Sequence, residues 1–187
     1  MQKNILLTVL LFLSTACTDK LYFTLGDTTH IEAKEVYRKV IAVEKVDIPK
    51  YLKDNSLVRQ ISPYQVELVK KANWLTPMQK RLTNVLISYL QKSLDNPNVY
   101  LYPWESGKNI DKRVALNITR FIAYKEEVLL EASYQIKERK KSGSKTKLFT
   151  TVVKIENKHV DAMVEAMEKA YFQLTDEIRK ELIKTKV

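Results

Sequence analysis

Three stretches decide the fold: VALNITRFIAY (residues 114–124), VLLEASYQI (128–136) and FTTVVKI (149–155). In each stretch apolar residues recur at every second position, as in a β-strand with one covered face. Short polar segments join the stretches, so the sequence predicts an antiparallel meander. The residues expected on the covered face are Val114, Leu116, Ile118, Ile122 and Tyr124; Val128, Leu130, Ala132, Tyr134 and Ile136; Phe149, Thr151, Val153 and Ile155.

Shorter β-rich segments precede the meander. Residues 21–25, 40–46 and 99–102 are predicted strands, and Pro49 ends the second of these regions because proline cannot donate to a strand ladder. Residues 57–61 and 64–69 flank Ser62-Pro63, which predicts a hairpin.

Two long helices are predicted. The first begins at Thr76-Pro77, with Thr76 as the cap, Pro77 in the first helical position and Gln79 completing a capping box. Its apolar stripe comprises Met78, Leu82, Val85, Leu86, Tyr89, Leu90 and Leu94.

The second helix is expected over residues 158–184, with a stripe of Val160, Val164, Met167, Tyr171, Leu174, Ile178 and Leu182. This stripe can pack on the sheet, or it can form a coiled coil with a partner. The predicted fold class is α+β, an antiparallel or mixed sheet packed by two long helices.

The amino-terminal segment is typical of an exported lipoprotein. A basic start and an apolar run over residues 5–13 precede Ser14-Thr15-Ala16-Cys17, and this run is too short to span a bilayer. We expect cleavage between Ala16 and Cys17 and lipid attachment at Cys17, the only cysteine. The predicted organisation is a signal peptide (1–16), a lipidated tether with the first strand (17–35) and a single periplasmic α+β domain (36–187).

Acyl chains on Cys17 would anchor the protein stably. Thr18, rather than Asp, follows the cysteine, which by the usual sorting rule predicts the outer membrane, facing the periplasm. Retention in the inner membrane is the alternative.

The net charge of +10 invites a nucleic-acid interpretation. The cations are mostly lysines scattered among acids, however, so we expect no nucleic-acid partner. Attraction to anionic lipid headgroups fits a tethered protein better.

Motifs for catalysis are weak. His30 and His159 lack a second ligand at metal spacing, and both are expected to be exposed, or capping in the case of His159. Gly143-Ser144-Lys145-Thr146 departs from a phosphate loop. We therefore expect no enzyme, metal or cofactor.

Aromatic residues cluster where the predicted strand 99–102 ends. Tyr100, Tyr102, Pro103 and Trp104, together with Trp74 before the first helix, can pack in the core and its rim. The alternative is a partner interface, in which Tyr and Trp are enriched.

The order of these motifs resembles the ABC-type transport auxiliary lipoproteins, the paraquat-inducible protein C (YmbA-like) group. The resemblance spans about residues 17–183. The features that carry it are the lipobox at Cys17, Leu21–Leu25, Ile48–Leu52, Trp74, Tyr102-Pro103-Trp104 and Arg113-Val114. Family members often have glycine in the turn where this chain has Lys125-Glu126-Glu127.

The resemblance implies a fold akin to the amino-terminal domain of TolB. It also implies docking to a mammalian-cell-entry (MCE) domain protein of a phospholipid transport system, a homo-oligomeric ring, and no catalytic residues. The alternative function is an outer-membrane assembly lipoprotein of the lipopolysaccharide-assembly kind.

Overall fold

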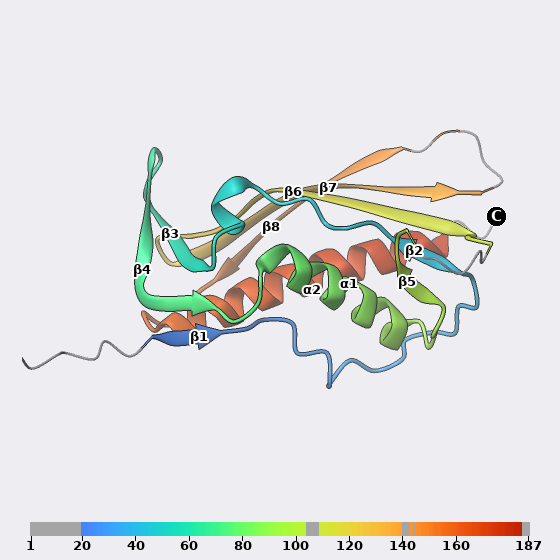
Figure 1. Cartoon of the computed structure of the whole chain (residues 1–187), viewed down its shortest axis with the longest axis horizontal. Helices are drawn as coiled ribbons and strands as arrows, with labels where there is room; N and C mark the ends of the chain where they lie inside the picture. Colours follow the sequence, from blue (N-terminus) through green and yellow to red (C-terminus); the bar gives the residue numbers. More distant parts are fainter. Residues whose placement is uncertain (1–19, 104–108, 140–142, 144, 185–187) are drawn as a thin grey trace, which may run out of the picture.

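The computed structural model describes residues 20–103, 109–139, 143 and 145–184. Eight strands and two long helices follow one another along the chain (Figure 1). In order they are β1 (Leu21–Phe23), β2 (Ile41–Val43), the short 3₁₀ helix η1 (Lys50–Leu52), β3 (Ser56–Ser62), β4 (Gln65–Trp74), α1 (Met78–Ser93), β5 (Val99–Leu101), β6 (Lys112–Tyr124), β7 (Glu127–Glu138), β8 (Thr146–Lys154) and α2 (Val160–Lys184).

The eight strands form one mixed sheet, which confirms the predicted α+β class. Strand β6 is its centre: β7 pairs antiparallel along one edge, while β2 and β3 pair in parallel with opposite ends of the other edge. Along one edge of β6, the sheet continues from β3 to β4 and β1 at one end, and from β2 to β5 at the other. Along the opposite edge, β7 is followed by β8. The likeness to the TolB domain stays a prediction.

The predicted meander is β6–β7–β8, with one correction. A β-bulge lies between Ile118 and Arg120 of β6. A bulge inserts one extra residue and reverses the facing of the residues after it. Phe121 and Ala123, both in the core cluster, therefore take the core positions that we predicted for Ile122 and Tyr124. Ile122 is also buried, but it lies outside the main core cluster.

Both helices lie on the same side of the sheet (Figure 1). Helix α2 packs on β6, β7 and β8, and α1 packs on β2 and β5 and contacts α2. The stripe of α2 is therefore a sheet-packing surface, as the first of the two alternatives predicted. The buried hydroxyl of Tyr171 in α2 donates a hydrogen bond of 2.7 Å to the carbonyl of Leu82 in α1, which fixes the two helices against each other.

The predicted start of the first helix is wrong in detail. Pro77 is the residue that precedes the helix, and no side chain caps the helix amino terminus. Instead of completing a capping box, the Gln79 amide donates to the Val46 carbonyl at 2.8 Å. A tertiary contact has thus replaced the local one, and it ties α1 to the segment after β2.

The described part of the predicted tether, residues 20–35, packs on the domain. Strand β1 pairs with β4, and Leu25 is 1% exposed. The Glu168 carboxylate of α2 accepts hydrogen bonds from the backbone amides of Gly26 and Asp27. The Lys34 ammonium lies 2.8 Å from the Asp176 carboxylate of α2. These contacts connect the segment both to the sheet and to the last helix.

The turn between β6 and β7 keeps its tight geometry without glycine. Lys125 has a φ of +55°, in the left-handed region where a side chain is unfavourable. Glu127 then opens β7 opposite Tyr124. Lys125-Glu126 thus connects the two strands, with Lys125 in a strained backbone conformation.

Candidate functional site

A hairpin projects from one end of the sheet. Residues 56–71 of β3 and β4, here called the arm, rise away from the helices (Figure 1). Along β3 the pairing with β4 shifts register twice, and β4 contains Lys71 with a φ of +62°. Such irregularities bend and twist strands. They explain why β3 pairs with β6 at two positions, Arg59 with Ala123 and Gln60 with Tyr124, before it leaves the sheet.

The arm exposes large apolar side chains. Tyr64 at its tip is 99% exposed, and exposed apolar residues continue along both strands: Ile61 (44%), Val66 (52%) and Leu68 (65%). An ion pair of 2.5 Å between Arg59 and Glu67 bridges the strands. An apolar surface on a projecting hairpin is typical of a site that meets a protein or a membrane.

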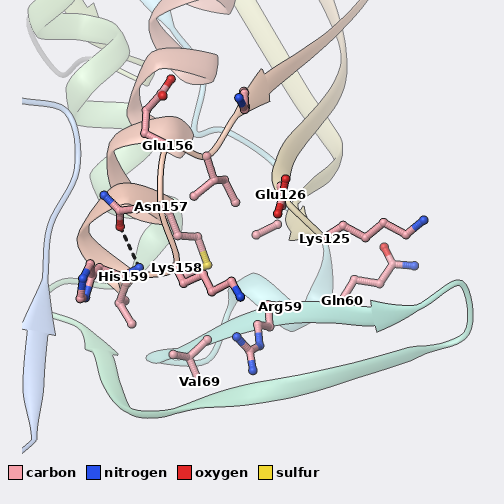
Figure 2. A pocket seen from close by; sticks show the side chains of 14 residues that line it. Arg59, Gln60, Val69, Lys125, Glu126, Glu156, Asn157, Lys158 and His159 are labelled. Carbon is pink, nitrogen blue, oxygen red and sulfur yellow. Dashed lines mark hydrogen bonds between the residues drawn. The ribbon is translucent and has the colours of Figure 1, made fainter.

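A pocket of about 580 Å³ lies at the base of the arm (Figure 2). Three parts of the chain form it: the arm, the β6–β7 turn, and the connector between β8 and α2. Its apolar lining includes Val69, Ile155, Val160 and Met163, all of which pack on the hydrophobic core. The pocket floor is therefore continuous with the core.

The charged lining of the pocket is predominantly basic. Arg59, Lys125, Lys154 and Lys158 face two carboxylates, Glu126 and Glu156, which leaves a surplus of two positive charges. Within the described part of the chain, no carboxylate lies within ion-pair distance of the three lysines. The site can thus attract an anion without first breaking an internal lysine ion pair.

His159 also lines this pocket, and its side chain is exposed, which is one of the two outcomes predicted for it. Its backbone amide donates to the Asn157 side-chain oxygen at 2.8 Å (Figure 2), while its imidazole is exposed. His30 contacts the Phe172 ring at 5.8 Å between ring centroids. Among the described residues, no group of three or more His, Cys, Asp or Glu side chains is placed to hold a metal ion.

The predicted aromatic residues divide between two places. Trp74 is 4% exposed and belongs to the core, near the base of the arm. Tyr100 lies within β5, and Tyr102 and Pro103 follow this strand directly; β5 lies at the end of the domain opposite the arm (Figure 1). Tyr102 is half-buried, and the Arg113 guanidinium lies 5.1 Å from the centre of its ring.

Three of the predicted functional residues lie outside the described part of the chain: Ala16, Cys17 and Trp104. The predicted signal segment, residues 1–16, lies outside it as well. Neither α1 nor α2, the long helices of the described chain, has the combination of length and apolar character needed to cross a membrane.

The arm surface and the pocket were not identified from the sequence. Val66 and Leu68 alternate with Glu67, a pattern that predicts a strand but does not show whether its apolar face is covered. The pocket joins residues that are distant in the chain, such as Arg59 and Lys158, and each alone is typical of a solvated surface lysine or arginine.

The fold and the family are defined by comparison with known proteins. An uncharacterised protein of known crystal structure is similar over 81% of this chain and 99% of its own, with 22% identity and a TM-score of 0.68. A Xanthomonas campestris protein of the DUF330 family is similar over 86% of this chain and 90% of its own, with 14% identity and a TM-score of 0.63. At these identities the likeness shows the fold alone. No curated protein matches the sequence.

The family model for the ABC-type transport auxiliary lipoprotein component matches residues 23–179, from the end of β1 into the last turns of α2. The chain belongs to this family.

Proposed function

We propose that the chain is a lipid-anchored, non-enzymatic accessory subunit of an ABC-type phospholipid transport system, in which it docks an MCE-domain protein in the periplasm. The observation that carries the proposal is the family match, because it covers the folded domain from Phe23 to Arg179. Cys17 would carry the anchor. Thr18, the residue after it, predicts the outer membrane by the usual sorting rule.

The arrangement of the domain supports this role. The chain enters through β1 at the end that carries the arm, while Tyr100–Pro103 lies at the opposite end (Figure 1). An anchor before β1 would therefore direct the aromatic segment away from the bilayer. Leu101 within this segment is 42% exposed, and aromatic side chains beside an exposed leucine suit a protein interface.

A pull-down experiment tests the docking. We expect the tagged full chain, extracted from the envelope in mild detergent, to recover an MCE-domain protein. Tyr102→Ala should reduce that recovery by about tenfold, the effect of losing one interface hot spot. Tyr64→Ala is the matched control, because it removes the same side chain from the opposite end of the domain.

Two results would contradict the proposal. Recovery of an outer-membrane barrel without an MCE-domain protein would favour the lipopolysaccharide-assembly alternative. Equal recovery by the Tyr102→Ala variant and the wild type, with both folded, would remove the aromatic segment as the interface.

The proposal includes self-association. Among the described strands β8 pairs with β7 alone, so its other edge is free to pair. Leu148 is 85% exposed and Val152 is 52% exposed on this strand. We expect Leu148→Lys to shift the chain to a smaller species in analytical ultracentrifugation. An unchanged sedimentation coefficient would exclude β8 as the contact between copies.

A further inference from the structure

The pocket at the base of the arm combines an apolar floor with a basic rim. Its floor is apolar, formed by Val69, Val160 and Met163. Its rim is basic, with Lys125, Lys154 and Lys158 exposed and without carboxylate partners among the described residues. A molecule complementary to both features has an anionic group joined to an apolar chain.

The side chains are arranged so that one molecule can reach both features. In Figure 2, Lys158 and Arg59 extend into the space between the start of α2 and the arm, and Val69 rises toward the same space from β4. Arg59 already has the Glu67 carboxylate at 2.5 Å, so Lys158 is the cation there that has no such partner. The pocket volume of about 580 Å³ suits a headgroup with the first part of an acyl chain.

The position of the pocket selects the source of such a molecule. Lys20 follows Cys17 by three residues, which span at most roughly 11 Å. Strand β1 pairs with β4 below the arm, and Leu21 (56%) and Tyr22 (61%) expose apolar surface there. If Cys17 is lipidated, as proposed above, this end of the domain lies at the bilayer surface. The pocket at the base of the arm then lies near the lipid headgroups.

We infer that this pocket binds an anionic phospholipid taken from the bilayer. The phosphate lies against Lys158 at the rim, and the acyl chain lies on the floor of Val69, Val160 and Met163. This inference rests on the proposed lipid anchor for the source of the ligand. The binding itself depends on the charges and the apolar floor of the pocket.

Lipid binding by the whole chain in a neutral detergent tests the inference. Phosphatidylglycerol and phosphatidylcholine are added separately, and bound lipid is measured by native mass spectrometry. The test variant is Lys125→Glu with Lys158→Glu. The control is Lys39→Glu with Lys184→Glu, two exposed lysines away from the pocket, because it changes the net charge equally.

The wild type and the control should bind phosphatidylglycerol about tenfold better than phosphatidylcholine, and the test variant should lose this preference. Equal loss in test variant and control, or no preference in the wild type, would overturn the inference. Displacement by millimolar inorganic phosphate would also overturn it, since it would show an anion site with no use for the apolar floor.

A second variant tests the floor separately. Val69→Asp places a carboxylate where the acyl chain should lie, on a half-buried strand position. Phosphatidylglycerol binding should fall about tenfold in a variant whose circular dichroism is unchanged, and undiminished binding would contradict the inference. The lipid-binding results do not depend on the pull-down. The docking proposal and the lipid-binding inference can therefore fail independently.

Discussion

Leu21 lies directly opposite Ala72 in a parallel pair of strands. The strand that follows the predicted anchor is thus hydrogen-bonded to the strand that forms the arm. Trp74, two residues after Ala72, pairs with Phe23 and is buried in the core. The entry of the chain, the arm and the pocket are therefore parts of one rigid end of the domain, and an anchor at Cys17 would fix the orientation of all three.

Gly26, in the segment that follows β1, lies against Val85 of α1. It has a φ of +85°, and an added Cβ would lie 2.2 Å from Cγ2 of Val85. We expect Gly26→Ala to lower the free energy of unfolding by about 2–4 kcal/mol, from overpacking and left-handed strain together. Urea denaturation of the whole chain measures it.

The control for this prediction is Gly143→Ala. Gly143 has a similar φ of +95°, but a Cβ there would have no atom within 4 Å. Strain alone should cost about 1 kcal/mol. If both variants lose the same stability, the close packing of Gly26 against α1 is not the feature that requires glycine.

Asp176 of α2 forms an ion pair with Lys34, in the segment between β1 and β2. Partial burial would raise its pKa, but hydrogen bonds from Lys34, Arg179, Lys180 and Tyr89 hold the pKa below the ordinary value of 3.8. A carboxylate with a lowered pKa stabilises the fold above its unfolded pKa, and this stabilisation is lost as the pH falls below about 4. Asp176→Asn should lower the free energy of unfolding at pH 7 by roughly 1–3 kcal/mol.

The pH profile distinguishes this role from a general effect of mutation. Between pH 5 and pH 2 the wild type should lose more stability than Asp176→Asn, so that the two curves converge. Asp95→Asn is the control, because its ion pair with Arg38 is exposed, at 56% and 61% for the two side chains, and should contribute little. Parallel curves for wild type and Asp176→Asn would refute the prediction.

The turn at Lys125 can be improved. Because Lys125 has a φ of +55°, Lys125→Gly should raise the free energy of unfolding by about 1 kcal/mol. Lys125→Ala keeps the Cβ and should give no gain. Thermal denaturation of the three proteins measures the difference, and equal gains for glycine and alanine would show that the backbone at this turn is not strained.

The parts of the fold that depend on periodicity could be predicted from the sequence. The meander and both helical stripes are predicted from spacings of two and of three to four residues, and the structure confirms their positions. The bulge after Ile118 could not be predicted. Phe121 and Ile122 are both apolar, so the sequence does not show which of them faces the core. The cap at Thr76 was predicted from local chemistry, but the Gln79 side chain bonds to Val46 instead.

The candidate site was harder to predict because it depends on which apolar side chains remain uncovered. Tyr64 and Trp74 are both aromatic residues of the same hairpin region, yet one is 99% exposed and the other 4%. Their local sequences do not distinguish them. Trp74 is buried where β4 pairs with β1. This pairing joins segments about fifty residues apart, and the sequence near Trp74 does not indicate it.

A lipid on Cys17 should hold the arm end of the domain at a membrane. Mass spectrometry of the amino-terminal peptide from the protein purified out of native membranes tests it most directly. We predict a chain that begins at Cys17 and carries a diacylglyceryl group on the sulfur. An amino terminus with an unmodified Cys17 thiol, or one that still contains residues 1–16, would contradict the account.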